Sequence, residues 1–392
     1  MQIFYFSCNL GRTFLQKNVF FAKNGTFCMS HTEKKNLKIA IDARMVARSG
    51  IGTCIQHWLK DVGYTIALGD PKDLEPYKNV PKHIPFISGI YGYKEQLKFP
   101  YRALYREKPD VLHIPHCNVP LFYRGKMIVT IHDLTHLIYP EFLPMKIVHW
   151  YFKFIFWFVS KRADKIIVVS ESTKQDLLRF YKTDESKITV IPSGVGKEFT
   201  RKPREEYDYL YEKYGIPRDK KILLYVGNLL PHKNLNGLLK GFAQMKGKEN
   251  CRLIFVGKAF DGRTKATQER ELGIEDLTIH AGMVSQEDLV NFYNLADLFV
   301  LPSLYEGFGL PVLESFACGT PVACSNTSSL PEVGGTVAKY FDPTDPACIA
   351  QALEKSLDDK GKYDAEMDAW VSKFSWEESS RKTREVAESL FL

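Results

Sequence analysis

Short apolar runs alternate along the chain with longer stretches in which apolar and polar residues are mixed. In the first half such runs occupy residues 37–42, 111–114, 127–131, 165–169 and 188–191. Near-continuous apolar runs of this length are typical of parallel strands that are covered on both faces. Helical or loop patterns separate them, so the first half predicts a doubly wound α/β domain.

A second series of apolar runs begins after a charged, Tyr-rich stretch that contains Pro203 and Pro217. Its predicted strands cover residues 222–226, 252–256, 277–279, 298–301 and 321–323. Because 392 residues exceed what one core usually organises, we predict two doubly wound, Rossmann-like domains, 37–205 and 221–375, which face each other across a cleft.

Residues 1–36 precede the first predicted strand and carry apolar patches that polar and basic residues interrupt. They lack the continuous apolar stretch of a secretory signal or a spanning helix, so we expect a leader that is peripheral to the fold or disordered. An apolar fraction of 45% and a charged fraction of 25% exclude a mostly disordered, collagen-like or polytopic membrane chain. Eight cysteines stand singly, which favours free thiols in a reducing, cytoplasmic compartment.

The net charge of +7 is concentrated in the first half of the chain. Residues 1–200 hold 29 Lys and Arg against 17 Asp and Glu, whereas residues 201–392 hold 24 against 29. No nucleic-acid-binding motif accompanies the basic half, so we expect no nucleic acid as a partner. The candidate partners of this half are an anionic membrane surface and a phosphorylated acceptor, and the alternative is a solvated basic face without a partner. The aromatic and basic stretch 149–162 is either a core helix or a membrane-surface helix at the inner face of the membrane.

Glu306 and Glu314 follow the predicted strand 298–301, and Gly307, Gly309 and Pro311 lie between them. The glycines allow backbone amides to approach a ligand, and the proline suits the first turn of a helix whose N-terminus favours an anion. A carboxylate before the turn can accept hydrogen bonds from sugar hydroxyls, and one inside the helix can reach a ribose diol. The alternative is an ordinary strand–loop–helix junction with solvated glutamates.

Three further sites stand beside predicted strands. Gly227 closes the first strand of the second series and allows a turn next to a ligand, and Lys233 can neutralise charge on a departing diphosphate, unless it is a plain surface lysine. His132 comes directly after the strand 127–131, where it is either catalytic or structural. The loop with Gly52 is a weak signal, because no third glycine completes a dinucleotide fingerprint.

The run from Tyr305 to Val322 resembles the donor-binding signature of retaining glycosyltransferases with the GT-B fold, glycosyltransferase family 4. The similarity extends from residue 37 to the C-terminus. It implies that the helix 376–392, for which Ser375 and Glu378 form a predicted capping box, crosses back to complete the first domain.

The resemblance also implies roles for individual residues. Glu306 is placed near the transferred sugar, Glu314 at the ribose, and the amides of Phe308, Gly309 and Leu310 at sugar and phosphate. It implies catalytic residues His132, Lys233 and Glu306, and donor contacts from Gly52, Gly227, Asn228 and Lys233. Many family members have arginine where this chain has Asn228, so Lys233 takes a larger share of the phosphate charge.

The expected reaction is the transfer of a hexose from a nucleotide sugar to a saccharide or lipid-linked acceptor of a surface polysaccharide or glycolipid. The phrases around His113 and Lys233 resemble mannosyltransferases, which makes GDP-mannose the first donor hypothesis. No Asp-x-Asp metal motif is present, so neither a metal nor another cofactor is expected. The alternatives are a nucleotide-sugar epimerase with the same fold and a protein that binds nucleotide sugars without turnover.

Overall fold

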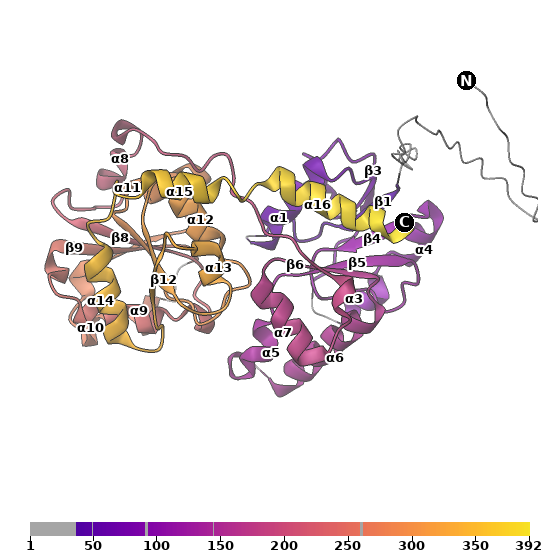
Figure 1. The fold of residues 1–392 in the computed structure, drawn as a ribbon, viewed down its shortest axis with the longest axis horizontal. Helices are drawn as coiled ribbons and strands as arrows, with labels where there is room; N and C mark the ends of the chain where they lie inside the picture. Colours follow the sequence, from indigo (N-terminus) through magenta and orange to yellow (C-terminus); the bar gives the residue numbers. More distant parts are fainter. Residues whose placement is uncertain (1–36, 49, 91–92, 144, 259–261) are drawn as a thin grey trace, which may run out of the picture. The chain divides into compact units, whose positions relative to one another are not determined.

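Two parallel sheets, each with helices on both sides, make up the part of the protein that the computed structural model describes (Figure 1). That part comprises residues 37–48, 50–90, 93–143, 145–258 and 262–392, so the predicted leader 1–36 lies outside it. Residues 38–392 cluster into one compact unit, and no helix within the described ranges is long and apolar enough to cross a bilayer.

The first sheet has seven strands in the order β3-β2-β1-β4-β5-β6-β7, and every pair of neighbours is parallel. Figure 1 shows α1 and α16 on one side of it and α6 and α7 on the other. Its elements are β1 (Ile39–Asp42), α1 (Ile51–Asp61), β2 (Ile66–Gly69), α2 (Pro71–Leu74), β3 (Lys82–Pro85), α3 (Tyr93–Lys98), α4 (Tyr101–Glu107), β4 (Val111–Ile114), β5 (Lys126–Ile131), α5 (Thr135–Ile138), α6 (Lys146–Arg162), β6 (Lys165–Val168), α7 (Glu171–Tyr181) and β7 (Ile188–Val190).

The second sheet has six parallel strands in the order β10-β9-β8-β11-β12-β13. Its elements are α8 (Tyr209–Lys213), β8 (Lys221–Val226), α9 (Leu235–Gln244), β9 (Cys251–Val256), α10 (Gly262–Glu271), β10 (Thr278–Gly282), α11 (Gln286–Leu295), β11 (Leu298–Leu301), α12 (Leu310–Ala317), β12 (Val322–Ser325), α13 (Leu330–Gly334), β13 (Lys339–Phe341), α14 (Pro346–Ser356) and α15 (Asp364–Val371). In the sequence, the strands of the first sheet precede the predicted domain boundary and those of the second sheet follow it. The exact domain limits stay a prediction.

Each sheet reverses its strand order once, between β1 and β4 in the first and between β8 and β11 in the second. Parallel strands all present their carboxyl ends to the same edge of the sheet. Where the strand order reverses, the loops that follow the two adjacent strands diverge and leave a crevice between them. Ligands of open α/β sheets bind in such crevices. The topology therefore singles out the loops after β1 and β4 in the first sheet and those after β8 and β11 in the second.

Side chains cap the starts of several helices. The side chain of Ser170 accepts from the Thr173 amide at the start of α7, and Asp345 does so from Ala347 at the start of α14. Ser375 caps α16 (Trp376–Glu388) by accepting from the Glu378 amide at 3.0 Å. The second half of that predicted capping box is absent, because the Glu378 carboxylate pairs with Arg381 instead.

The C-terminal helix α16 packs against α1 of the first half. The Trp376 ring stacks on His57 with centroids 4.5 Å apart, and the Trp58 indole donates to the Ser379 hydroxyl at 3.4 Å. Arg384 donates to the carbonyl of Val62 at 2.9 Å. These contacts attach α16 to the half of the protein that carries the first sheet.

Candidate functional site

The loop after β11 leads into α12 through two glycines. Gly309 caps the helix with a φ of 109°, a conformation that favours glycine, and Pro311 lies in the first turn, where it loses no hydrogen bond. In the first turn of α12 Pro311 has no N–H and the Val312 amide donates to the Gly309 carbonyl at 3.0 Å, so the Leu310 amide is the one at the start of the helix that can bind an anion. The Phe308 side chain is buried in the core, so this residue offers a ligand only its backbone, and Leu310 opens the helix.

Glu306 and Lys233 form an ion pair at the strand-order reversal of the second sheet. Lys233 ends a 3₁₀ turn after β8, and its Nζ lies 2.6 and 2.8 Å from the two carboxylate oxygens of Glu306. Ser303 donates to the same carboxylate at 2.6 Å, and both charged side chains are only 20% and 12% exposed. Two residues that are 73 positions apart are thus brought together where a ligand is expected.

Glu314 lies inside α12 and faces Tyr293 of α11, whose hydroxyl donates to its carboxylate at 2.8 Å. Burial raises the pKa of Glu314 to about 7, with a smaller contribution from the charge of Glu198, although the Tyr293 hydrogen bond opposes the rise. The side chain keeps partial access to solvent. A half-buried carboxyl group with a raised pKa is suited to bind polar hydroxyls of a ligand.

The turn after β8 contains Gly227 and Asn228. A Cβ added at the neighbouring Gly257, which has a φ of 141°, would lie 2.2 Å from the Gly227 carbonyl oxygen, so the two turns pack with no room for a side chain. The Asn228 side chain is exposed, and the backbone carbonyl of Asn228 accepts a hydrogen bond from the Tyr225 hydroxyl at 3.2 Å. Sequence reasoning missed Gly257, whose only signal is a glycine directly after a buried strand.

His132 follows β5 and lies close to the loop that carries Glu306. A Cβ added at Gly307 would stand 1.9 Å from the His132 carbonyl oxygen, so only glycine permits the approach. The His132 Nε2 lies 3.1 Å from the Pro115 carbonyl, which assigns the proton to Nε2 and leaves Nδ1 as an acceptor. Burial lowers the pKa of His132 to about 4 despite the nearby charge of Asp133, so the ring is neutral near pH 7.

Gly52 lies in the first turns of α1, where a Cβ would come within 2.7 Å of the Met45 carbonyl oxygen and 2.8 Å of that of Val46. Local packing therefore explains the glycine. A ligand contact at Gly52 stays a prediction. The His136 ring stacks on the Phe152 ring with centroids 4.1 Å apart.

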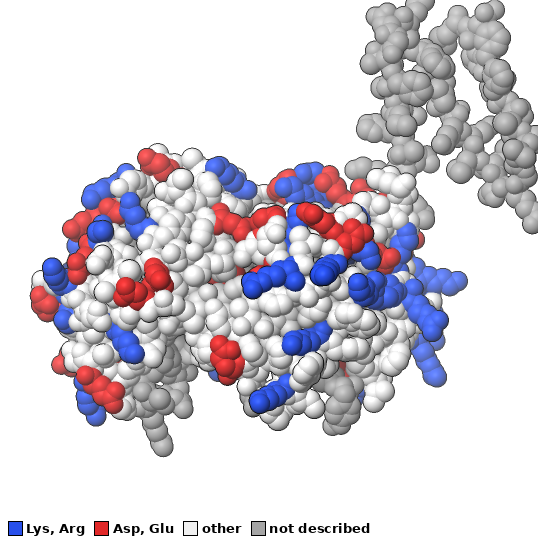
Figure 2. Space-filling model, turned by 60° about the horizontal axis from the view of Figure 1, so that its bottom comes forward, with Lys and Arg blue, Asp and Glu red and all other residues white. Residues whose placement is uncertain are grey.

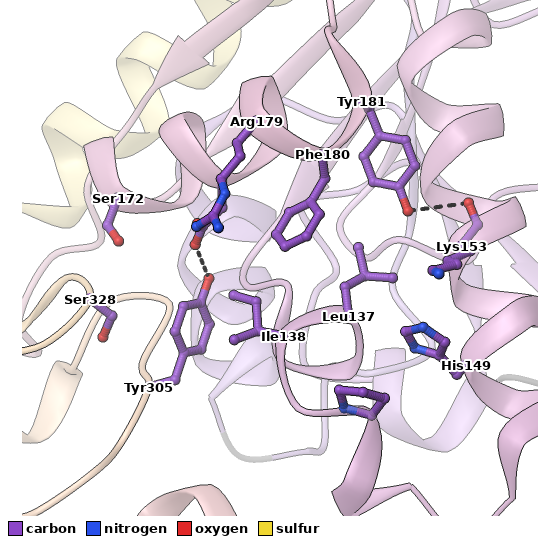
Figure 3. A pocket seen from close by; sticks show the side chains of 12 residues that line it. Leu137, Ile138, His149, Lys153, Ser172, Arg179, Phe180, Tyr181, Tyr305 and Ser328 are labelled. Atoms are coloured by element: carbon purple, nitrogen blue, oxygen red, sulfur yellow. Dashed lines mark hydrogen bonds between the residues drawn. The ribbon is translucent and has the colours of Figure 1, made fainter. Parts of the chain in front are cut away.

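A cavity of about 830 Å³ borders the same loop and was not predicted from the sequence (Figure 3). Tyr305, next to Glu306, forms one side and donates to Asp176 of α7 at 2.8 Å. Ser328 also lines the cavity, and its hydroxyl accepts from the Glu306 amide at 2.9 Å. Two cationic side chains of the first half also line the cavity: Arg179 lies beside Tyr305, and Lys153 lies at the opposite side (Figure 3). The space is suited to a polar or anionic ligand next to Glu306.

A buried charged cluster closes the end of β1 and was also missed. Arg44 Nη2 lies 2.5 Å from both Asp42 and Glu95, and all three side chains are at most 3% exposed. His116 lies 3.2 Å from Asp42. Burial opposes the ionisation of Asp42, but the charges and hydrogen bonds of Arg44 and His116 outweigh it and hold its pKa well below the usual range. The sequence showed only a carboxylate at a strand end.

Metal ligands and cysteines add little to this site. Within the described ranges, no group of three or more His, Cys, Asp or Glu side chains is arranged to hold a metal ion. The six cysteines that these ranges contain are free thiols.

Comparison with known proteins agrees with this geometry. The family model "Glycosyl transferases group 1" matches residues 208–370, and "Glycosyltransferase Family 4" matches residues 64–199. The chain is 30% identical over 287 residues to the O-antigen chain mannosyltransferase B of Escherichia coli, covering 72% of this chain and 74% of that protein. It is 31% identical over 284 residues to the serotype-specific mannosyltransferase WbdA of Escherichia coli, covering 67% of this chain but only 33% of that longer protein.

Among solved structures, Anabaena HepE in complex with UDP and glucose superposes with a TM-score of 0.73 at 17% identity, covering 90% of this chain and all of that one. At this identity the likeness concerns the fold. Together with the relatives and the two sheets, it confirms the resemblance stated from the donor-binding run. The chain belongs to glycosyltransferase family 4, the glycosyl transferases of group 1, and has their GT-B fold.

Proposed function

We propose that this protein transfers a hexose, with mannose from GDP-mannose as the first candidate, to a saccharide or lipid-linked acceptor with retention of anomeric configuration. The observation that carries the proposal is the half-buried Lys233–Glu306 pair at the strand-order reversal of the second sheet. The names of the mannosyltransferase relatives support the donor sugar, and the UDP and glucose bound to HepE support a nucleotide-sugar donor.

The donor would bind with its diphosphate between Lys233 and the backbone amides of Phe308, Gly309 and Leu310 at the start of α12. A phosphate in this position shares the Lys233 ammonium with Glu306, whose carboxylate then accepts hydrogen bonds from the sugar hydroxyls. Glu314 lies eight residues further on, inside the helix, and would hold the ribose hydroxyls. Gly227 and Asn228 would contribute the backbone and an exposed amide at the other side of the crevice.

In the proposed reaction the bond between the anomeric carbon and the diphosphate oxygen breaks, and the acceptor hydroxyl forms the new glycosidic bond on the same face. The acceptor proton passes to the departing diphosphate. Lys233 stabilises the negative charge that develops there, an effect typically worth about 10²- to 10³-fold in rate for one well-placed donor. Since a fixed cation supplies this charge, we propose that no metal is needed.

His132 would act as a hydrogen-bond acceptor rather than as an acid. Its lowered pKa keeps the ring neutral, and its Nε2 proton is held by the Pro115 carbonyl. The free Nδ1 can then accept a hydrogen bond from a hydroxyl of the transferred sugar or of the acceptor. The cavity lined by Tyr305 would offer the acceptor a place next to the loop that carries Glu306.

The test is nucleoside diphosphate release from a panel of nucleotide sugars, measured with and without saccharide acceptors. We expect acceptor-dependent release that Glu306→Gln and Lys233→Ala each reduce by about 10²-fold or more. Lys240→Ala, an exposed lysine on α9, is the matched control and should leave the rate unchanged. Interconversion of the donor without an acceptor would indicate an epimerase, binding without release would indicate a non-catalytic protein, and either result contradicts the proposal.

A chelator tests the metal independently. We expect full activity in its presence, and activity that is lost with the chelator and restored by manganese would contradict this part of the proposal. The free thiols fit a reducing compartment, so we place the reaction on the cytoplasmic side of the membrane.

A further inference from the structure

The helix α6 has two faces of different character. Its inner face packs into the core of the first half through Phe152, Ile155, Phe156 and Val159. Its outer face is apolar as well, although it lies in solvent: Ile147 is 70% exposed, Trp150 66%, Phe154 45% and Trp157 49%. A single exposed apolar residue needs no explanation, but four large ones on one helix face do.

Lysines alternate with these apolar side chains on the outer face. Lys146, Lys153 and Lys161 are exposed and share the helical spacing of the apolar four, and Lys153 Nζ lies 4.8 Å from the centre of the Trp150 ring. The helix contains no Asp or Glu. We call these seven residues, 146, 147, 150, 153, 154, 157 and 161, the outer face of α6.

The acidic groups near this helix are engaged elsewhere or lie outside it. Asp164, just after the helix, pairs with Arg162 at 3.5 Å, and Asp176 accepts from Tyr305. Glu171 and Glu185 both pair with Lys174 of α7. Glu141 is exposed but precedes the helix by five residues. Figure 2 likewise shows Lys and Arg gathered over the half that carries the first sheet.

We propose that the outer face of α6 docks onto a bilayer that contains anionic phospholipids. Trp and Phe side chains beside lysines are the composition of helices that lie in the membrane interface, where the rings enter the headgroup region and the ammonium groups meet lipid phosphates. A symmetric dimer through this face is disfavoured, because it would bring three lysines of one copy against three of the other without a carboxylate between them.

Docking would also place the cavity beside Glu306 close to the lipid headgroups. Lys153 belongs to the outer face and at the same time lines that cavity, together with His149 one turn earlier (Figure 3). Where the proposed function holds, a lipid-linked acceptor could therefore reach the site from the membrane without leaving it. Docking itself does not depend on the proposed function.

Vesicle flotation of the full chain tests the proposal. We expect the protein to float with vesicles of phosphatidylcholine and phosphatidylglycerol in equal amounts, to float far less with phosphatidylcholine alone, and to be released by salt. The variant Trp150→Ser/Phe154→Ser/Trp157→Ser should lower the partition coefficient at least tenfold, and Lys146→Gln/Lys161→Gln should weaken binding only to the anionic vesicles.

The matched control replaces exposed apolar residues elsewhere, Leu97→Ser and Met283→Ser, which are 77% and 74% exposed. All of these apolar side chains are at least 45% exposed, so the variants should stay folded with at most a small fall in the unfolding temperature, which circular dichroism checks. Flotation of the triple serine variant at the parent's level would overturn the proposal. The proposal would also be overturned if the parent did not bind anionic vesicles and eluted as a dimer that the serine substitutions dissociate. Acceptor-dependent release with a water-soluble acceptor tests the proposed function separately.

Discussion

Replacing Glu314 by glutamine removes a carboxyl group whose ionisation the fold resists. The pKa of this group rises from an ordinary value of 4.5 to about 7, chiefly through burial. The folded protein therefore binds the proton more tightly than the unfolded chain does. The stability that protonated Glu314 provides is fully present below about pH 4.5 and is lost as the pH rises through about 7.

The size of this effect follows from the difference between the two pKa values. At about 1.4 kcal/mol for each pH unit, it reaches roughly 3 kcal/mol when the carboxyl is fully buried. Glu314 keeps partial access to solvent, so we expect about 1–2 kcal/mol. The amide oxygen of glutamine can still accept from Tyr293, which lies 2.8 Å from the carboxylate, so the packing is preserved.

The assay is urea unfolding followed by circular dichroism at several values between about pH 5 and about pH 8. The free energy of unfolding of Glu314→Gln should increase relative to that of the parent as the pH rises, and the difference should level off above about pH 7. Glu366→Gln, at an exposed glutamate of α15, is the control for the loss of a negative charge. If the difference in free energy of unfolding between the parent and Glu314→Gln stayed constant over this pH range, the raised pKa of Glu314 would be contradicted.

Three other substitutions test separate parts of the structure. Arg44→Met leaves two buried carboxylates without their cation and should lower the free energy of unfolding by about 3–5 kcal/mol in the same urea assay; an unchanged midpoint would contradict a buried cluster. Gly257→Ala should weaken nucleotide-sugar binding and stability more than Gly247→Ala, because only the first Cβ meets a neighbour, at 2.2 Å from the Gly227 carbonyl. His132→Gln should lower kcat without changing Tm. Because the His132 ring stays neutral above about pH 4, the kcat profiles of the parent and of this variant should have the same shape between about pH 6 and about pH 7.

Most of the apolar strands could be predicted, among them the edge strands β7 and β10, whereas three short strands, β2, β3 and β13, could not. Strands β4 and β11 have the predicted bounds, and most others differ by one or two residues. The edge strands β3 (Lys82–Pro85) and β13 (Lys339–Phe341) escaped because they carry polar and exposed residues and are short. Strand β2 (Ile66–Gly69) is fully buried, but Ala67 and Gly69 are poor strand formers, so the pattern does not separate it from a loop.

Site residues were predicted where the chemistry is local and missed where it depends on folding. The start of α12 at Gly309 and Pro311 follows from residue type alone. The pairing of Lys233 with Glu306 does not, because it joins the loops of two strands that become neighbours only in the sheet. The burial of Arg44 between two acids likewise depends on residue 95 folding back onto β1, a contact with no signal in the sequence.

Equilibrium binding of nucleotide sugars, measured by titration calorimetry, probes the donor site without an acceptor. We expect at least one nucleoside diphosphate sugar, GDP-mannose first among them, to bind the parent, and we expect Lys233→Ala to weaken this binding at least tenfold while Lys240→Ala leaves it unchanged. Equal affinity of the parent and Lys233→Ala for that ligand would contradict the placement of the donor at the Lys233–Glu306 pair.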